Sequence, residues 1–130
     1  MDEHPRQPFV LDHIAKPLIA TGRLEPWASN MRELARRPNV WGKLSGMVTE
    51  ADWRTDPVRA SSLETLKPYL DVAVEAFGPT RLIAGSDWPV CLLATGYAQW
   101  FELLRSYFAS FSEPERDAIF GGTAIEVYGL

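Results

Sequence analysis

Residues 81–89 read Arg-Leu-Ile-Ala-Gly-Ser-Asp-Trp-Pro, a short apolar run that ends in a hydroxyl and a carboxylate. Continuous apolar runs of this kind are typical of strands that are buried on both faces of a parallel sheet. Two similar runs precede this one, at residues 9–12 and 40–45, and each also ends at polar side chains. We therefore predict three buried strands, each with polar groups at its carboxyl end.

A stretch with helical periodicity follows each of these runs. Apolar residues recur on one face in each stretch, which predicts helices at 27–37, from Pro68 to Phe77 and at 97–108. Proline suits a first helical turn, and Gly78 is placed to end the second helix. Alternating strands and helices predict right-handed parallel βαβ units, hence an α/β fold. The pattern alone does not separate part of a closed barrel from an open sheet.

Two short helices are expected near the C-terminus. Ser112-x-x-Glu115 and Thr123-x-x-Glu126 both have the spacing of a capping box. In that motif, a hydroxyl and a carboxylate satisfy free backbone N–H groups at a helix start. We expect each box to begin one helix.

The composition excludes several classes of function. The 130 residues fit one domain, with a net charge of −4 and no Lys/Arg cluster longer than Arg36-Arg37. This charge distribution offers no basic patch that could bind nucleic acid. No apolar run approaches the roughly 18 residues of a membrane span. One cysteine, Cys91, excludes an intrachain disulfide, and no secretory signal is evident. We expect a cytoplasmic protein with neither a nucleic-acid nor a membrane partner.

The polar residues at the strand ends are the candidates for chemistry, because parallel α/β folds place their sites there. His13 can ligate a metal or move a proton; otherwise it bonds a loop carbonyl. Asp87 can act as a base or a ligand; otherwise it caps backbone N–H groups before Pro89. Lys43 lies inside an apolar strand, so it either reaches the surface or has a carboxylate or substrate partner.

Two loop tryptophans are further candidates. Trp53 and Trp88 follow the second and third strands, where they form an apolar wall for a small ligand or pack on the helix layer. Cys91 has no cationic neighbour in sequence and is interpreted as a small apolar residue. The sequence has no G-x-S-x-G elbow, phosphate loop, dinucleotide fingerprint, His-x-His pair or zinc-binding cysteine pair.

Four stretches, in this order and spacing, closely resemble one known family. They are residues 10–17, 43–53, 81–91 and 119–124, and the resemblance extends over about residues 9–130. The family is the amidohydrolase-related group of sugar-lactone hydrolases, of the L-fuconolactonase and L-rhamnono-lactonase type. One departure is Thr123, where the family pattern has asparagine.

The resemblance implies a TIM (β/α)₈ barrel of which residues 1–130 form an incomplete part. This part comprises the C-terminal three βα units and short terminal helices, without the N-terminal half. The implied activity is hydrolysis of a sugar-acid lactone by activated water, in carbohydrate metabolism. Some members bind a divalent metal such as zinc, and others work without one.

The resemblance also implies roles for single residues. His13 matches a middle-strand histidine and Asp87 the last-strand aspartate, so both are expected to be catalytic and to ligate any metal. The residues expected to contact the lactone are Lys43, Trp53, Ser86 and Trp88.

Three interpretations of the chain remain open at this point. It is a fragment or miscalled start of an active lactonase; a half-barrel module that pairs with a separate half or with itself; or an inactive gene remnant. Two ligands are too few for a metal site of three or more protein ligands. Unpaired strand edges also predict association.

Overall fold

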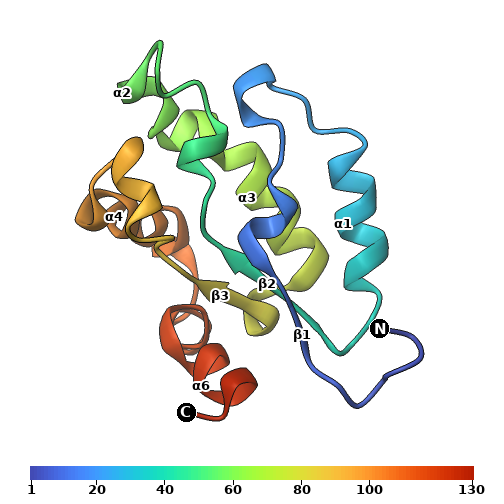
Figure 1. Ribbon diagram of the computed structural model, residues 1–130. Coiled ribbons are helices and arrows are strands. Elements are labelled where there is room, and N and C mark those ends of the chain that lie inside the picture. The colour runs from blue at the N-terminus through green and yellow to red at the C-terminus, as the bar shows by residue number, and fades with distance from the viewer.

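Three parallel strands form the centre of the computed structural model, which describes all 130 residues (Figure 1). They are β1 (Phe9–Leu11), β2 (Val40–Leu44) and β3 (Leu82–Ala84), in the order β1-β2-β3. Leu11 pairs with Gly42, and Leu44 pairs with Ala84. The predicted α/β class and parallel strands are confirmed. The outer edges of β1 and β3 have no neighbouring strand.

Helices connect the strands and continue after them. Two long helices, α1 (Trp27–Ala35) and α3 (Leu63–Phe77), make the crossovers and pack against each other. The other helices are α2 (Pro57–Ala60), α4 (Tyr97–Tyr107), α5 (Glu113–Asp117) and α6 (Thr123–Tyr128). A π-helical turn, Ala118–Gly122, joins α5 to α6. None of the helices is both long enough and apolar enough to cross a bilayer.

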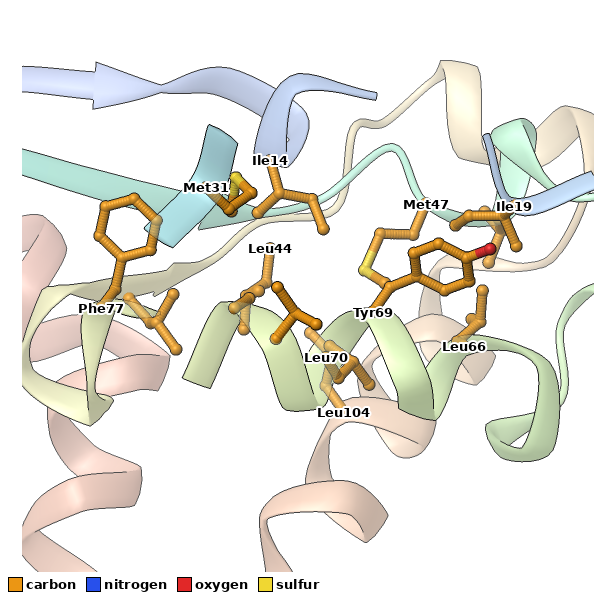
Figure 2. Close-up of a cluster of buried hydrophobic side chains, with 14 of the residues drawn as sticks. Ile14, Ile19, Met31, Leu44, Met47, Leu66, Tyr69, Leu70, Phe77 and Leu104 are labelled. Atoms are coloured by element: carbon orange, nitrogen blue, oxygen red, sulfur yellow. The ribbon is translucent and has the colours of Figure 1, made fainter. Parts of the chain in front are cut away.

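The hydrophobic core lies on one face of the sheet. Along β2 the buried residues Val40, Gly42 and Leu44 alternate with the half-buried Trp41 and Lys43, as the two-residue period of a strand requires. Figure 2 shows how side chains from β2, from α3 and from the turn after β1 meet in one cluster. Full burial of a leucine such as Leu44 contributes about 1.5–3 kcal/mol relative to its exposure.

The prediction that Pro68 begins a helix is wrong. Helix α3 begins five residues earlier, at Leu63, because Ser62 caps it: its Oγ accepts a hydrogen bond from the Thr65 amide at 3.3 Å. Pro68 therefore lies in the second turn, where it removes one backbone hydrogen bond. The complete burial of Leu66 and Leu70 on this helix offsets that loss.

One of the two predicted capping boxes is formed. Glu115 Oε2 accepts from the backbone N–H and the hydroxyl of Ser112, at 2.8 and 2.7 Å. A helix, α6, does begin at Thr123 as predicted, but its capping box is not formed, because the chain enters α6 from the π-helical turn and leaves no free helix start to cap. The Thr123 hydroxyl is instead buried and donates to the carbonyl of Thr80 at 3.3 Å.

Two tryptophans link the helices to the carboxyl ends of the strands through hydrogen bonds from their indole N–H groups. Trp27, at the start of α1, donates its indole N–H to the carbonyl of Ile14 at 2.7 Å. Trp100, in α4, donates to the carbonyl of Gly85, also at 2.7 Å. These bonds hold the backbone beside β1 and β3 against the helices, at the edge of the sheet where polar side chains gather.

Candidate active site

The carboxyl ends of β1 and β3 bring His13 and Asp87 together across the end of β2. His13 Nε2 lies 3.8 Å from Asp87 Oδ1, and both side chains are mostly buried. The residues are 74 positions apart in sequence, and the parallel order β1-β2-β3 brings the ends of their two strands to the same edge of the sheet. Both can therefore contact one small molecule.

The backbone at both residues is left-handed. Four residues in succession, His13 to Lys16, have φ between 42° and 58°, and Asp87 has φ of 57°. Residues other than glycine rarely adopt this conformation, at a cost of about 1–3 kcal/mol each. The fully buried Ile14 and the bond from Trp27 to its carbonyl hold the first of these segments. Such strain clusters at functional sites, where a side chain must point in an otherwise unfavourable direction.

Ser45 holds the other nitrogen of the His13 ring. The distance from His13 Nδ1 to Ser45 Oγ is 2.8 Å, so the ring bonds a side-chain hydroxyl and not a loop carbonyl. Gly46 packs against the same ring with φ of 65°, and a Cβ there would lie 2.9 Å from Nδ1. Glycine is thus required at this position both by the backbone and by the close approach of the ring.

Lys43 has the carboxylate partner that its place in an apolar strand requires. Its Nζ lies 2.9 Å from Asp12 Oδ1, and Asp12 Oδ2 lies 3.1 Å from His13 Nε2. The hydrogen bond from Lys43 holds the pKa of Asp12 below its ordinary value, although partial burial opposes this. Burial also opposes the charged form of Lys43, but hydrogen bonds to Asp12 and Tyr128 outweigh it and raise its pKa.

We call Asp12, His13, Lys43, Ser45 and Asp87 the strand-end cluster. Asp12 and Ser45 were recognisable from the sequence as polar residues at strand ends, but no functional role was predicted for either. Asp12 directly precedes His13, and Ser45 ends the strand that contains Lys43, so proximity in sequence was the signal that could have found them.

The other predicted contact residues lie outside this cluster. Ser86 Oγ accepts from the Trp88 amide at 3.1 Å, so Ser86 makes the local cap that was considered for Asp87. Trp88, two residues further along the chain, is 63% exposed. Trp53 packs against the hydrophobic core, with the guanidinium of Arg54 over its ring. Their contact with substrate remains a prediction.

Cys91 is fully buried. Burial raises the pKa of its thiol, and the charge of Asp87 adds to the effect. Both effects disfavour the nucleophilic thiolate, in agreement with its interpretation as a small apolar residue.

The candidate metal ligands fit one ion only in part. The 3.8 Å between His13 Nε2 and Asp87 Oδ1 suits two ligands of one zinc ion, since Zn–N and Zn–O bonds are about 2.0–2.2 Å long. No three His, Cys, Asp or Glu side chains converge in a metal-binding arrangement. Catalytic zinc sites have three protein ligands, so His13 and Asp87 alone do not complete such a site.

A well-defined cavity lies away from this cluster. It has a volume of about 650 Å³ and is formed by the turn at 19–22, the loop at 52–56, α2 and the start of α3. No residue of the strand-end cluster lines it. The cluster instead lies at the open mouth of a three-stranded sheet, where no further strands enclose it.

Comparisons with known proteins match the whole chain. A family model described as amidohydrolase matches residues 1–130. The chain is 47% identical to L-fucono-1,5-lactonase of Burkholderia multivorans, over 98% of this chain and 45% of that protein. It is 43% identical to L-fucono-1,5-lactonase of Burkholderia ambifaria, over 98% of this chain and 43% of that protein. The chain thus spans under half the length of these relatives.

A solved structure has the same fold over this region. The crystal structure of an amidohydrolase from Burkholderia multivorans with bound zinc superposes with a TM-score of 0.93 at 48% identity. The superposition covers 99% of this chain and 46% of that one. A relative of this chain therefore binds zinc in the crystal.

Proposed function

The chain belongs to the amidohydrolase family, and from this premise we propose that it carries part of an active site that hydrolyses the lactone of a sugar acid. The observation that carries the proposal is the approach of His13 Nε2 to Asp87 Oδ1, at 3.8 Å, from two separate strand ends. An imidazole and a carboxylate at this distance can serve one water and one carbonyl group. Relatives named as lactonases support this substrate class.

In the proposed reaction, Asp87 takes a proton from water as the water oxygen attacks the lactone carbonyl carbon. His13 stabilises the developing oxyanion through its ring N–H. The C–O bond of the lactone ring then breaks, its oxygen takes up the proton from Asp87, and the products are a free hydroxyl group and a carboxylic acid, which loses its own proton to solvent. A divalent metal held by His13, Asp87 and ligands from outside this chain would polarise the carbonyl group as a Lewis acid.

We further propose that the active form is a closed (β/α)₈ barrel in which these are the last three βα units. In a closed barrel every strand edge is paired, whereas β1 and β3 each have one free edge here. The partner would be a segment containing the remaining strands, such as the part of the lactonase relatives that the chain does not match. This partner supplies the missing ligands and most of the specificity loops.

The test is complementation. The chain is assayed on L-fucono-1,5-lactone and a panel of related lactones, alone and after co-refolding with the unmatched part of the Burkholderia multivorans lactonase. We expect hydrolysis from the combination and little or none from either part. If the combination forms a complex but hydrolyses none of these lactones, while the intact relative does, the proposed function is wrong. Activity of the chain alone would refute the proposed need for a partner.

A further inference from the structure

We propose that Ser45 is a positioning residue that orients the His13 imidazole, so that its Nε2–H faces the carboxylates of the strand-end cluster. The consequence for catalysis rests on the proposed function, whereas the orientation itself does not. The argument begins from burial: Ser45 is only 1% exposed and is one of two buried polar residues in the chain. Its only side-chain hydrogen bond is with His13 Nδ1, at 2.8 Å.

The direction of this bond follows from what faces the other ring nitrogen. His13 Nε2 lies 3.1 Å from Asp12 Oδ2 and 3.8 Å from Asp87 Oδ1. Carboxylate oxygens only accept hydrogen bonds, so a bare nitrogen lone pair between them would be repelled. Nε2 therefore carries the proton, and Nδ1 of the neutral ring accepts from the Ser45 hydroxyl.

Lys43 helps to keep this arrangement in place. Its ammonium lies 2.9 Å from Asp12 Oδ1 and favours the ionised carboxylate, which then accepts from His13. Gly46 also lies close to the ring, where a Cβ would be 2.9 Å from both Cγ and Nδ1. The imidazole thus has a partner at each nitrogen and a close backbone neighbour, which together fix its tautomer and its direction.

A serine suits this position better than an obligate donor or acceptor would. Its hydroxyl donates to Nδ1 of the neutral ring, and it accepts from Nδ1–H if the ring becomes positively charged or binds a ligand through Nε2. Partners of this kind orient catalytic and metal-binding histidines, and their loss typically costs about 10–100-fold in affinity or activity.

Two-bond ¹H–¹⁵N NMR spectra of the histidine rings, recorded where both rings are neutral, test the inference directly. The chain has only two histidines, and His4 is exposed with no ring hydrogen bond, so it serves as an internal reference. We expect His13 to show one Nε2–H tautomer, with an Nδ1 resonance displaced from that of His4 by its hydrogen bond. A His13 spectrum that matches His4 in the wild type overturns the inference without any variant.

Variants then identify Ser45 as the cause. Ser45→Ala should move the Nδ1 resonance of His13 towards that of His4, and Ser45→Cys, a weaker donor, should move it less. The matched control is Thr123→Val, which removes the other buried hydroxyl, 2% exposed and bonded to Thr80. An unchanged His13 spectrum in folded Ser45→Ala, or an equal change in Thr123→Val, overturns the inference.

The complemented barrel gives the functional readout. Ser45→Ala should lower kcat about 10–100-fold while KM changes less than about threefold, and Ser45→Cys should recover part of kcat. If the wild-type barrel is inactive but the NMR changes occur, the proposed function fails and the positioning role stands. If the barrel is active and Ser45→Ala retains full kcat, the positioning role fails and the proposed function stands.

Discussion

The hydrophobic core and the strand-end cluster are built on the same three strands but follow opposite rules. The core places fully buried side chains such as Leu44 and Leu70 between the sheet and α3. The strand-end cluster places charged side chains at an open mouth, on a backbone that is left-handed at His13 and Asp87. Stability is therefore concentrated in the core, whereas the cluster holds strained residues that the core must support.

The largest expected effect is the loss of activity on Asp87→Asn in the complemented barrel. Asparagine accepts the left-handed backbone that Asp87 adopts, so the fold should be retained while the proposed base is lost. We expect kcat to fall about 10²–10⁴-fold, with the urea unfolding midpoint nearly unchanged. Full lactone hydrolysis by this variant would show that Asp87 is not the base.

The converse change is Leu44→Ala in the core. Leu44 has no exposed surface, and truncation of such a leucine typically lowers the free energy of unfolding by about 2–5 kcal/mol. Urea denaturation followed by circular dichroism measures this. The exposed Leu18→Ala is the control and should cost far less. If Leu44→Ala also lowers the kcat of the folded molecules as strongly as Asp87→Asn does, stability and catalysis do not depend on separate regions.

A smaller effect is expected at Gly46, where the two regions meet. Alanine at a positive φ costs about 1–2 kcal/mol, and a Cβ would also contact the His13 ring. Gly22→Ala is a matched control, since Gly22 has φ of 66° and a Cβ there would meet no atom within 4 Å. Thermal unfolding should show a larger loss for Gly46→Ala, and only this variant should shift the His13 NMR signals. Equal losses and unchanged signals would refute the close packing.

The smallest effect concerns the Asp12–Lys43 pair and pH. Lys43 lowers the folded-state pKa of Asp12, so the pair stabilises the fold above the unfolded-state pKa, and this contribution disappears as pH falls through the folded value. The Asp12 side chain is 57% exposed, which limits the contribution to below about 1 kcal/mol.

Carboxyl ¹³C titration tests this prediction. Lys43→Met should raise the pKa of Asp12, and the stability difference from wild type should shrink as the pH is lowered from about 6 towards about 3. Lys67→Met, which removes a cation that pairs with Asp71, should leave Asp12 unchanged. A Lys43→Met variant whose Asp12 titrates as in the wild type would mean that the pair does not form in solution.

The strands and the approach of His13 to Asp87 were predictable because both depend on regular rules. Apolar runs mark buried strands, and parallel strands end at the same edge of a sheet. The start of α3 was misplaced because Pro68 has a strong preference for a first turn, but tertiary burial and the Ser62 cap decided the outcome.

The remaining contacts of the cluster depend on strand register. Asp12 reaches Lys43, and His13 reaches Ser45, because Leu11 pairs with Gly42 rather than with a neighbouring residue. A shift by one residue would reverse the faces, and no pattern in the sequence specified that pairing. The left-handed segment from His13 to Lys16 contains no glycine, so its conformation had no sequence signal.

The indole bonds from the helices give the cluster an intrinsic optical probe. Trp27 is bonded to the carbonyl beside His13, and Trp100 to the carbonyl two residues before Asp87. Any displacement of these backbone segments changes the polarity around an indole and therefore its emission wavelength. Fluorescence of variants that retain only Trp27 or only Trp100 would thus report separately on the two sides of the mouth, without an added label.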